Sequence, residues 1–185
     1  MDFLPDSWVY PLSLASTMII RLSQEMARKR KLLPLLEAPP APDPLVDWSC
    51  REFRVGRHLF WMASHTSSLY SVLMRPQPSR TSADFARRIL DQVADHAQTR
   101  GYERFASRLR TDRGDTRFAK ALNRRVTGSI NELTGFAMVF IDSPEDDLKA
   151  VSDRLNTLLF SILGNKKNDY GRPRDALESL LAGNP

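Results

Sequence analysis

Hydrophobic positions along this chain follow two periods, one typical of helices and one typical of strands. Apolar residues recur at steps of three and four in five segments, and this spacing predicts amphipathic helices. Those helices are expected over residues 16–31, 82–99, 129–142, 144–163 and 173–182. Apolar and polar residues alternate in other segments, which predicts strands that bury one face. The strands are expected over residues 51–56, 58–64, 68–74 and 116–122.

The order of these segments predicts an α+β fold. The first three strands follow one another with short turns, and Gly56 can take the positive φ that a tight hairpin needs. They are therefore expected to form an antiparallel meander. The fourth strand joins from beyond the helix over residues 82–99. We predict an antiparallel sheet of three to four strands packed against about five helices.

Residues 129–142 carry the strongest helical pattern. Ser129 and Glu132 have the spacing of a capping box, in which each side chain accepts a backbone N–H of the other residue, so the helix is expected to begin at Ser129. Apolar residues then extend nearly all round the helix and include Phe136 and Val139. Such a helix is expected to lie in the core.

The first quarter of the chain differs in composition from the remainder. Trp8 and Tyr10 stand among prolines near its start, which predicts an extended arm lying on the domain. Five prolines between residues 34 and 47 predict a stiff loop. We expect an arm, a helix and a proline-rich loop over residues 1–47, followed by a single α+β domain over residues 48–185.

Composition limits the class of protein. With 185 residues, of which 42% are hydrophobic, the chain is long enough to bury one core. Its one cysteine, Cys50, cannot form an internal disulfide and fits a reducing compartment. No run approaches the roughly 18 apolar residues that cross a bilayer, and Asp2 and Asp6 stand where a secretory signal would be basic. We expect a cytoplasmic protein without membrane contact.

The net charge of +5 is concentrated in one segment. Residues 100–128 hold nine lysines and arginines against three acids. Such a segment suits a nucleic-acid partner, because cations displace the counterions condensed on phosphates, although a solvated basic face is the alternative. The surface expected to contact nucleic acid consists of Arg104, Arg108, Arg110, Arg113, Arg117, Lys120, Arg124 and Arg125.

The end of this basic segment is a candidate anion site. Two guanidinium groups, an amide and a hydroxyl precede the predicted helix start, where free N–H groups also favour an anion. The residues concerned are Asn123, Arg124, Arg125 and Ser129. The structural alternative is that Asn123 and Ser129 only cap the helix while the arginines are solvated.

No pattern identifies a metal or a cofactor, and we expect neither. The three histidines are scattered, and none has the spacing of a metal ligand pair. His65, in a turn between two predicted strands, is a candidate for a general base near neutral pH. An exposed turn histidine without a catalytic role is the alternative. Cys50 has no catalytic signature and fits a small buried hydrophobic residue.

Five short motifs follow one another in a recognisable order. They are Val55-Gly56-Arg57, Ser68-Leu69-Tyr70-Ser71-Val72, the segment from Ala119 to Glu132, Leu155-Asn156, and Pro173-Arg174-Asp175-Ala176-Leu177. In this order residues 48–182 resemble an uncharacterised bacterial domain-of-unknown-function family, whose members are often found on plasmids and other mobile elements. The chain departs from that pattern at His65, where an asparagine is usual, and at Leu158, where a proline is usual. The resemblance implies one domain and a bacterial cytoplasmic origin, but no mechanism.

Three functions are compatible with these observations. The leading hypothesis is a non-enzymatic bacterial binding or regulatory domain that contacts nucleic acid through the basic surface. The second is a protein-interaction module of a defence or toxin system, in which residues 1–47 dock a protein partner through Trp8, Tyr10 and the proline-rich loop. The third is a small metal-independent nuclease that uses His65 with an arginine of residues 117–125.

Overall fold

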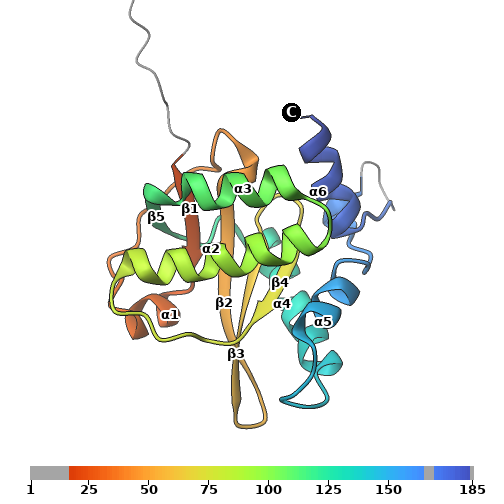
Figure 1. The fold of residues 1–185 in the computed structure, drawn as a ribbon, viewed down its shortest axis with the longest axis horizontal. Coiled ribbons are helices and arrows are strands. Elements are labelled where there is room, and N and C mark those ends of the chain that lie inside the picture. Colours follow the sequence, from red (N-terminus) through yellow and green to blue (C-terminus); the bar gives the residue numbers. More distant parts are fainter. Residues whose placement is uncertain (1–16, 165–168, 184–185) are drawn as a thin grey trace, which may run out of the picture.

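The computed structural model describes residues 17–164 and 169–183, and these form an α+β fold with five strands and six helices. The arm expected around Trp8 and Tyr10 lies outside the described residues. The strands form one sheet in the order β4-β3-β2-β1-β5 (Figure 1). Their bounds are Met18–Leu22 for β1, Asp47–Val55 for β2, His58–His65 for β3, Ser71–Met74 for β4 and Thr116–Lys120 for β5.

The sheet is mixed. β2, β3 and β4 form the expected antiparallel meander, with Gly56 at a φ of 54° in the first hairpin. β1, however, runs parallel to both of its neighbours, β2 and β5. The prediction of a wholly antiparallel sheet of three to four strands is therefore wrong, because β1 adds a fifth strand whose two partners are distant along the chain.

β1 occupies the first part of the segment where a helix over residues 16–31 was expected. All five residues of Met18–Leu22 are buried, so the strand has no polar side and shows no two-residue alternation. A short apolar run of this kind is typical of a central parallel strand and cannot be separated from a buried helical turn by its period. The helical part is only Gln24–Lys29 (α1), where the Ser23 side chain accepts the Met26 N–H at 3.2 Å.

The remaining helices agree with the predictions in part. They are α2 (Ser82–Thr99), α3 (Glu103–Thr111), α4 (Arg124–Phe140), α5 (Leu148–Leu155) and α6 (Pro173–Ala182). α2 and α6 are confirmed, whereas α3 was not predicted and α5 is shorter than the expected helix over residues 144–163. Asn156 explains why α5 ends where it does, because its side-chain amide accepts the Ser71 N–H at 2.7 Å and donates to the Ser71 carbonyl at 2.9 Å.

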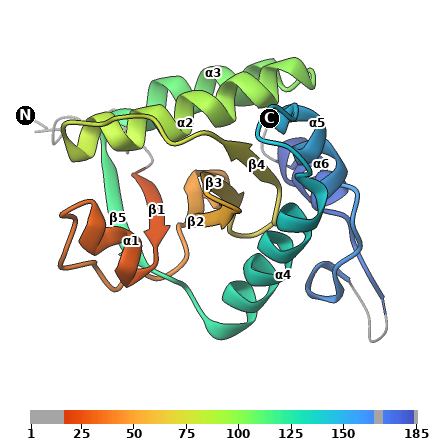
Figure 2. The same cartoon turned by 90° about the horizontal axis from the view of Figure 1, so that it is seen from below.

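Helices cover both faces of the sheet. Figure 2 shows α2 and α3 on one face and α4 on the other, with α1 near β1 and β5 on the α4 side. Side chains alternate along β2, β3 and β4, so the two faces of these strands contribute to two different apolar cores. The core under α2 and α3 contains Trp48, Trp61, Phe85 and Phe105. The core under α4 and α5 contains Phe53, Phe60, Leu133 and Leu155.

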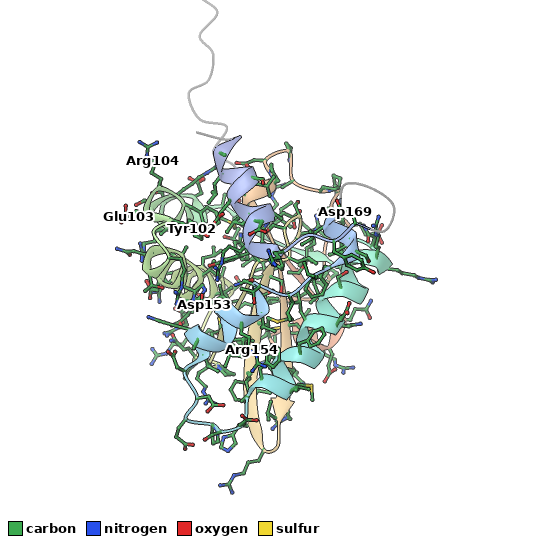
Figure 3. The ribbon with its side chains drawn as sticks, turned by 90° about the vertical axis from the view of Figure 1, so that its right-hand side faces the viewer. Tyr102, Glu103, Arg104, Asp153, Arg154 and Asp169 are labelled. Carbon is green, nitrogen blue, oxygen red and sulfur yellow. The ribbon has the colours of Figure 1, made fainter. Side chains whose placement is uncertain are left out.

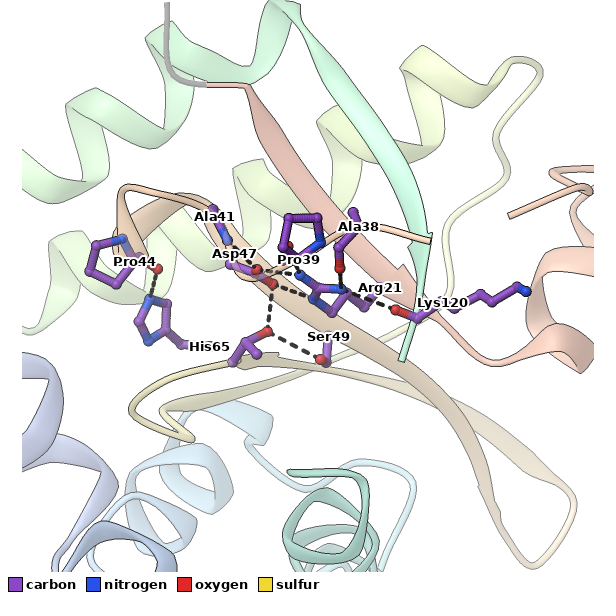
Figure 4. Close-up of polar contacts among 10 residues, drawn as sticks. Arg21, Ala38, Pro39, Ala41, Pro44, Asp47, Ser49, His65 and Lys120 are labelled. Atoms are coloured by element: carbon purple, nitrogen blue, oxygen red, sulfur yellow. Dashed lines mark hydrogen bonds and ion pairs between the residues drawn. The ribbon is translucent and has the colours of Figure 1, made fainter. Parts of the chain in front are cut away.

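The proline-rich loop crosses the sheet and buries Arg21 of β1. Arg21 donates twice to the Asp47 carboxylate, at 2.8 and 2.7 Å, and its other N–H groups donate to the carbonyls of Ala38, Pro39 and Lys120 (Figure 4). The Asp47 carboxylate also accepts the Thr66 hydroxyl and the Ala41 N–H. A buried ion pair is stabilising only when its remaining polar atoms are satisfied, and here all of them are. We interpret the network as structural.

Candidate functional site

The candidate anion site lies where α4 begins, but the helix starts earlier than expected. Asn123 is the N-cap, and its side-chain oxygen accepts the Val126 N–H at 2.9 Å. Ser129 lies inside the helix, where its hydroxyl donates to the Arg125 carbonyl at 3.3 Å. The capping box predicted at Ser129 is therefore wrong, because the asparagine six residues upstream caps the helix first. Arg124 and Arg125 consequently occupy the first turn of α4.

α4 is buried on one side only. Its sheet-facing side buries Ile130, Leu133, Thr134 and Ala137. The opposite side exposes three large apolar residues that were expected in the core, Phe136 (36% exposed), Met138 (47%) and Val139 (70%). Composition predicted the apolar character correctly. Within the described structure, however, the helix packs against β2, α5 and residues 161–163 on one side only, so these three side chains face outward.

The residues predicted to form one basic surface lie on two sides of the molecule. α3 and α4 pack on opposite faces of the sheet (Figure 2), and the intervening strand β5 is at the sheet edge. The α3 group consists of Arg104, Arg108 and Arg110. The β5–α4 group consists of Arg117, Lys120, Asn123, Arg124, Arg125 and Ser129. The side chain of Arg113 lies outside the described part of the structure.

Two of the three α3 arginines already have carboxylate partners. Arg108 forms ion pairs with Asp43 and Asp112, and Arg110 contacts Asp95 at 2.7 Å. A phosphate ligand would have to compete with these carboxylates for the guanidinium groups. Arg108 and Arg110 are therefore better explained as surface ion pairs than as phosphate ligands.

The β5–α4 group keeps more of its positive charge available. Lys120 pairs with Glu37 at 2.7 Å. The other guanidinium groups of this group form no ion pair within the described residues, and the same is true of Arg104 on α3, which projects from the edge of the molecule (Figure 3). Within the predicted basic surface, the exposed arginines that have no such partner among the described residues are Arg104, Arg117, Arg124 and Arg125. Only Arg124 and Arg125 are adjacent in sequence and share a helical turn.

His65 is not the exposed turn histidine that the sequence suggested. It is fully buried, with Nε2 2.7 Å from the Pro44 carbonyl and Nδ1 2.8 Å from the Ser68 hydroxyl. Because the carbonyl can only accept, Nε2 carries the proton. Burial lowers the pKa of His65 to about 4, so the ring is neutral at pH 7. Both ring nitrogens are engaged within the protein, and neither is available to move a proton to or from a substrate.

A second buried histidine belongs to a cluster that sequence reasoning missed. His96 of α2 is 1% exposed, its ring centroid lies 5.8 Å from that of Tyr70, and its Nε2 is 3.6 Å from Asp153 of α5. Asp153 also forms an ion pair with Arg100, on the side of the molecule where Tyr102 lies (Figure 3). No sequence spacing signals this cluster, because its members come from separate elements.

The cluster leaves three buried polar atoms without a hydrogen bond, namely Tyr70 Oη, His96 Nδ1 and His96 Nε2. Burial, followed by the positive charge of Arg100, lowers the pKa of His96 to about 4. Buried polar atoms normally have partners, and ordered water supplies them where protein does not. Since His96 and Tyr70 are each 1% exposed, the cluster offers no surface to a substrate.

The other chemical candidates do not form a site. Burial raises the pKa of the Cys50 thiol to about 12, which confirms a buried thiol rather than a reactive thiolate. Among the described residues, no three His, Cys, Asp or Glu side chains are grouped so that they could hold a metal ion. None of the helices in the described ranges is long and apolar enough to span a membrane.

A comparison with family models identifies an uncharacterised domain. A model described as a domain of unknown function matches residues 19–176, from within β1 to within α6. This confirms that the resemblance seen in the short motifs is to a domain of unknown function, and it extends the match into β1 and the proline-rich loop. No curated protein matches the chain.

Proposed function

The chain belongs to the DUF6933 family, a family of unknown function, and on that premise we propose that it is a non-enzymatic domain that binds nucleic acid at the start of α4. The binding residues are Arg124 and Arg125, here called the α4 arginine pair. The resemblance in the short motifs supports a bacterial, cytoplasmic protein of plasmids or other mobile elements. A nuclease that uses His65 as its base is not proposed, because both ring nitrogens are engaged.

One observation carries the proposal: two adjacent, exposed guanidinium groups stand in the first turn of a 17-residue helix without a carboxylate partner among the described residues. A guanidinium group can bind phosphate oxygens with two parallel hydrogen bonds. The amino end of a helix adds free N–H groups and a positive dipole end. No ion pair within the described chain has to break before a phosphate binds here.

The test measures binding of short single- and double-stranded DNA and RNA as a function of salt. Replacing Arg124 and Arg125 with alanine is expected to weaken binding at low salt by roughly tenfold or more. It should also reduce the slope of log affinity against log salt by about one for each arginine, because each phosphate contact releases counterions.

A matched control removes the same charge from the opposite face of the sheet. The double variant Arg104→Ala and Arg110→Ala should change the affinity much less, since α3 carries these residues and Arg110 is already paired. Equal weakening by both double variants would mean that binding follows net charge, and the α4 arginine pair would not be the site. A wild-type protein that binds none of the four nucleic acids even at low salt contradicts the proposal.

A further inference from the structure

A cavity of about 510 Å³ lies between the proline-rich loop and the sheet. It lies on the face of β5 opposite to α2, because Phe118 contacts Phe85 of α2 and neighbouring strand residues point the other way. Its volume falls in the range of about 300–1,000 Å³ that is typical of small-molecule sites. Its walls are mainly apolar and include Ile19, Leu36, Pro39, Pro40, Val46 and Ala119.

The loop that forms the outer wall of the cavity is held in place by the protein itself. Leu36 pairs with the outer edge of β5, where it donates to the Phe118 carbonyl at 3.2 Å and accepts the Lys120 N–H at 2.8 Å. Further along the loop, the carbonyls of Ala38 and Pro39 accept hydrogen bonds from the buried guanidinium group of β1 (Figure 4). A wall that is already ordered loses little conformational entropy when a ligand binds against it.

The charges around the cavity leave one cation without an ion pair in the described chain. Three of the side chains that line the cavity are charged, namely Glu37, Asp43 and Arg117. Glu37 forms an ion pair with Lys120 at 2.7 Å, and Asp43 forms one with Arg108. Arg117 is exposed and has no carboxylate partner among the described residues. The lining and its partners therefore carry a net charge of +1, which a single carboxylate would balance.

We propose that this cavity binds a small aromatic monocarboxylate. Its ring lies against the proline rings and the apolar side chains of the sheet, because flat apolar faces of this kind pack well on aromatic groups. Its carboxylate accepts two parallel hydrogen bonds from the guanidinium group of Arg117. The proposal does not rest on nucleic-acid binding, which was assigned to the α4 arginine pair.

Fluorine NMR of para-(trifluoromethyl)benzoate mixed with the full chain tests the proposal, and para-(trifluoromethyl)benzyl alcohol serves as the neutral probe of similar shape. The dissociation constant of the benzoate is expected to be about tenfold lower than that of the alcohol, because hydrogen bonds between charged groups stabilise more than neutral ones. Arg117→Gln should remove this preference. It should weaken binding of the benzoate by about tenfold and change the affinity for the alcohol by less than about twofold.

A matched variant and the protein's own methyl signals locate the bound probe. Arg124→Gln removes the same charge from an exposed arginine that does not line the cavity, and it should leave both affinities unchanged. The benzoate should shift the methyl signals of Ile19 and Val46, which line the cavity. It should not shift those of Ile130, which belongs to the core under α4.

A wild-type chain that binds neither probe at millimolar concentration overturns the proposal. So does an affinity for the benzoate that survives Arg117→Gln, which would place the carboxylate elsewhere, or one that falls equally in Arg124→Gln, which would mean that binding follows net charge. Equal affinities of the wild type for the benzoate and the alcohol would show that the cavity does not select a carboxylate. Methyl shifts confined to residues outside the cavity would also contradict the assignment.

Discussion

Two buried histidines show how differently the same residue type can be accommodated. Both ring nitrogens of His65 have partners, from the Ser68 hydroxyl and the Pro44 carbonyl. Neither ring nitrogen of His96 has a hydrogen-bond partner. The sequence placed His65 in the turn after the second predicted strand, whereas it is the last residue of β3. The sequence could not predict its burial either, because the Pro44 carbonyl that accepts its proton is 21 residues away. Local patterns specify turns, whereas burial depends on long-range packing.

Both histidines should make the protein sensitive to acid. Their pKa values are lowered to about 4 in the folded state, against about 6.5 in an unfolded chain, so the unfolded state binds more protons between these pH values. Stability is therefore complete above pH 6.5 and falls as the pH drops towards 4. Each histidine contributes up to about 1.4 kcal/mol per pH unit. Urea unfolding at pH 7, 6 and 5 measures this slope.

Substitution by phenylalanine separates the two residues. His96→Phe removes one titrating group and no hydrogen bond, so the pH slope should decrease while the free energy of unfolding at pH 7 stays nearly constant. His65→Phe leaves the Pro44 carbonyl without its donor and should cost about 1–3 kcal/mol at pH 7. A pH slope unchanged in both variants would mean that carboxylates, rather than these histidines, cause the acid sensitivity.

At the scale of single elements, the sequence predicted type better than boundaries. α2 and α6 were found where their periodicity placed them, because each has a regular apolar stripe. The stripe of α5 continued into residues that leave the helix, since Asn156 bonds to Ser71 instead. β1 was mistaken for a helix because both of its faces are buried. The sequence therefore mispredicts the boundary or the type of an element where tertiary contacts override the local hydrophobic period.

The start of α4 allows the competing caps to be compared directly. Asn123→Ala removes the side-chain oxygen that accepts the Val126 N–H, and it should lower the free energy of unfolding by about 1 kcal/mol. Ser129→Ala removes only a hydroxyl that donates to the Arg125 carbonyl inside the helix, so its effect should stay within about 0.5 kcal/mol. Urea unfolding of both variants is the measurement, and a larger loss at Ser129 would show that the helix begins there.

At the scale of the whole molecule, the sheet order was the feature least accessible from sequence. The meander of β2, β3 and β4 follows the chain and was predicted, but β1 pairs with β5 across almost 100 residues. The candidate site, like the strand order, could be predicted from the sequence only in part. Arg124 and Arg125 could be named from sequence, whereas the separation of the α3 arginines on the other face of the sheet required the layer arrangement (Figure 2).

The position of β1 leads to a prediction about how the chain divides. Sequence composition suggested a separate domain over residues 48–185, yet β1 lies between β2 and β5, and its Arg21 satisfies the buried carboxylate of Asp47. A chain of residues 48–185 would lack β1, leaving the facing edges of β2 and β5 without hydrogen-bond partners and removing one wall of the core.

We therefore expect residues 48–185 to show no cooperative thermal transition by circular dichroism, whereas residues 17–185 should retain one. Both truncated chains lack the first sixteen residues, but only the shorter one lacks β1. A difference between them therefore cannot come from the loss of residues 1–16. A cooperative transition in residues 48–185 would mean that β2 and β5 close the gap or that β5 is dispensable, and residues 17–47 would then be an appendage to a sheet that forms without them.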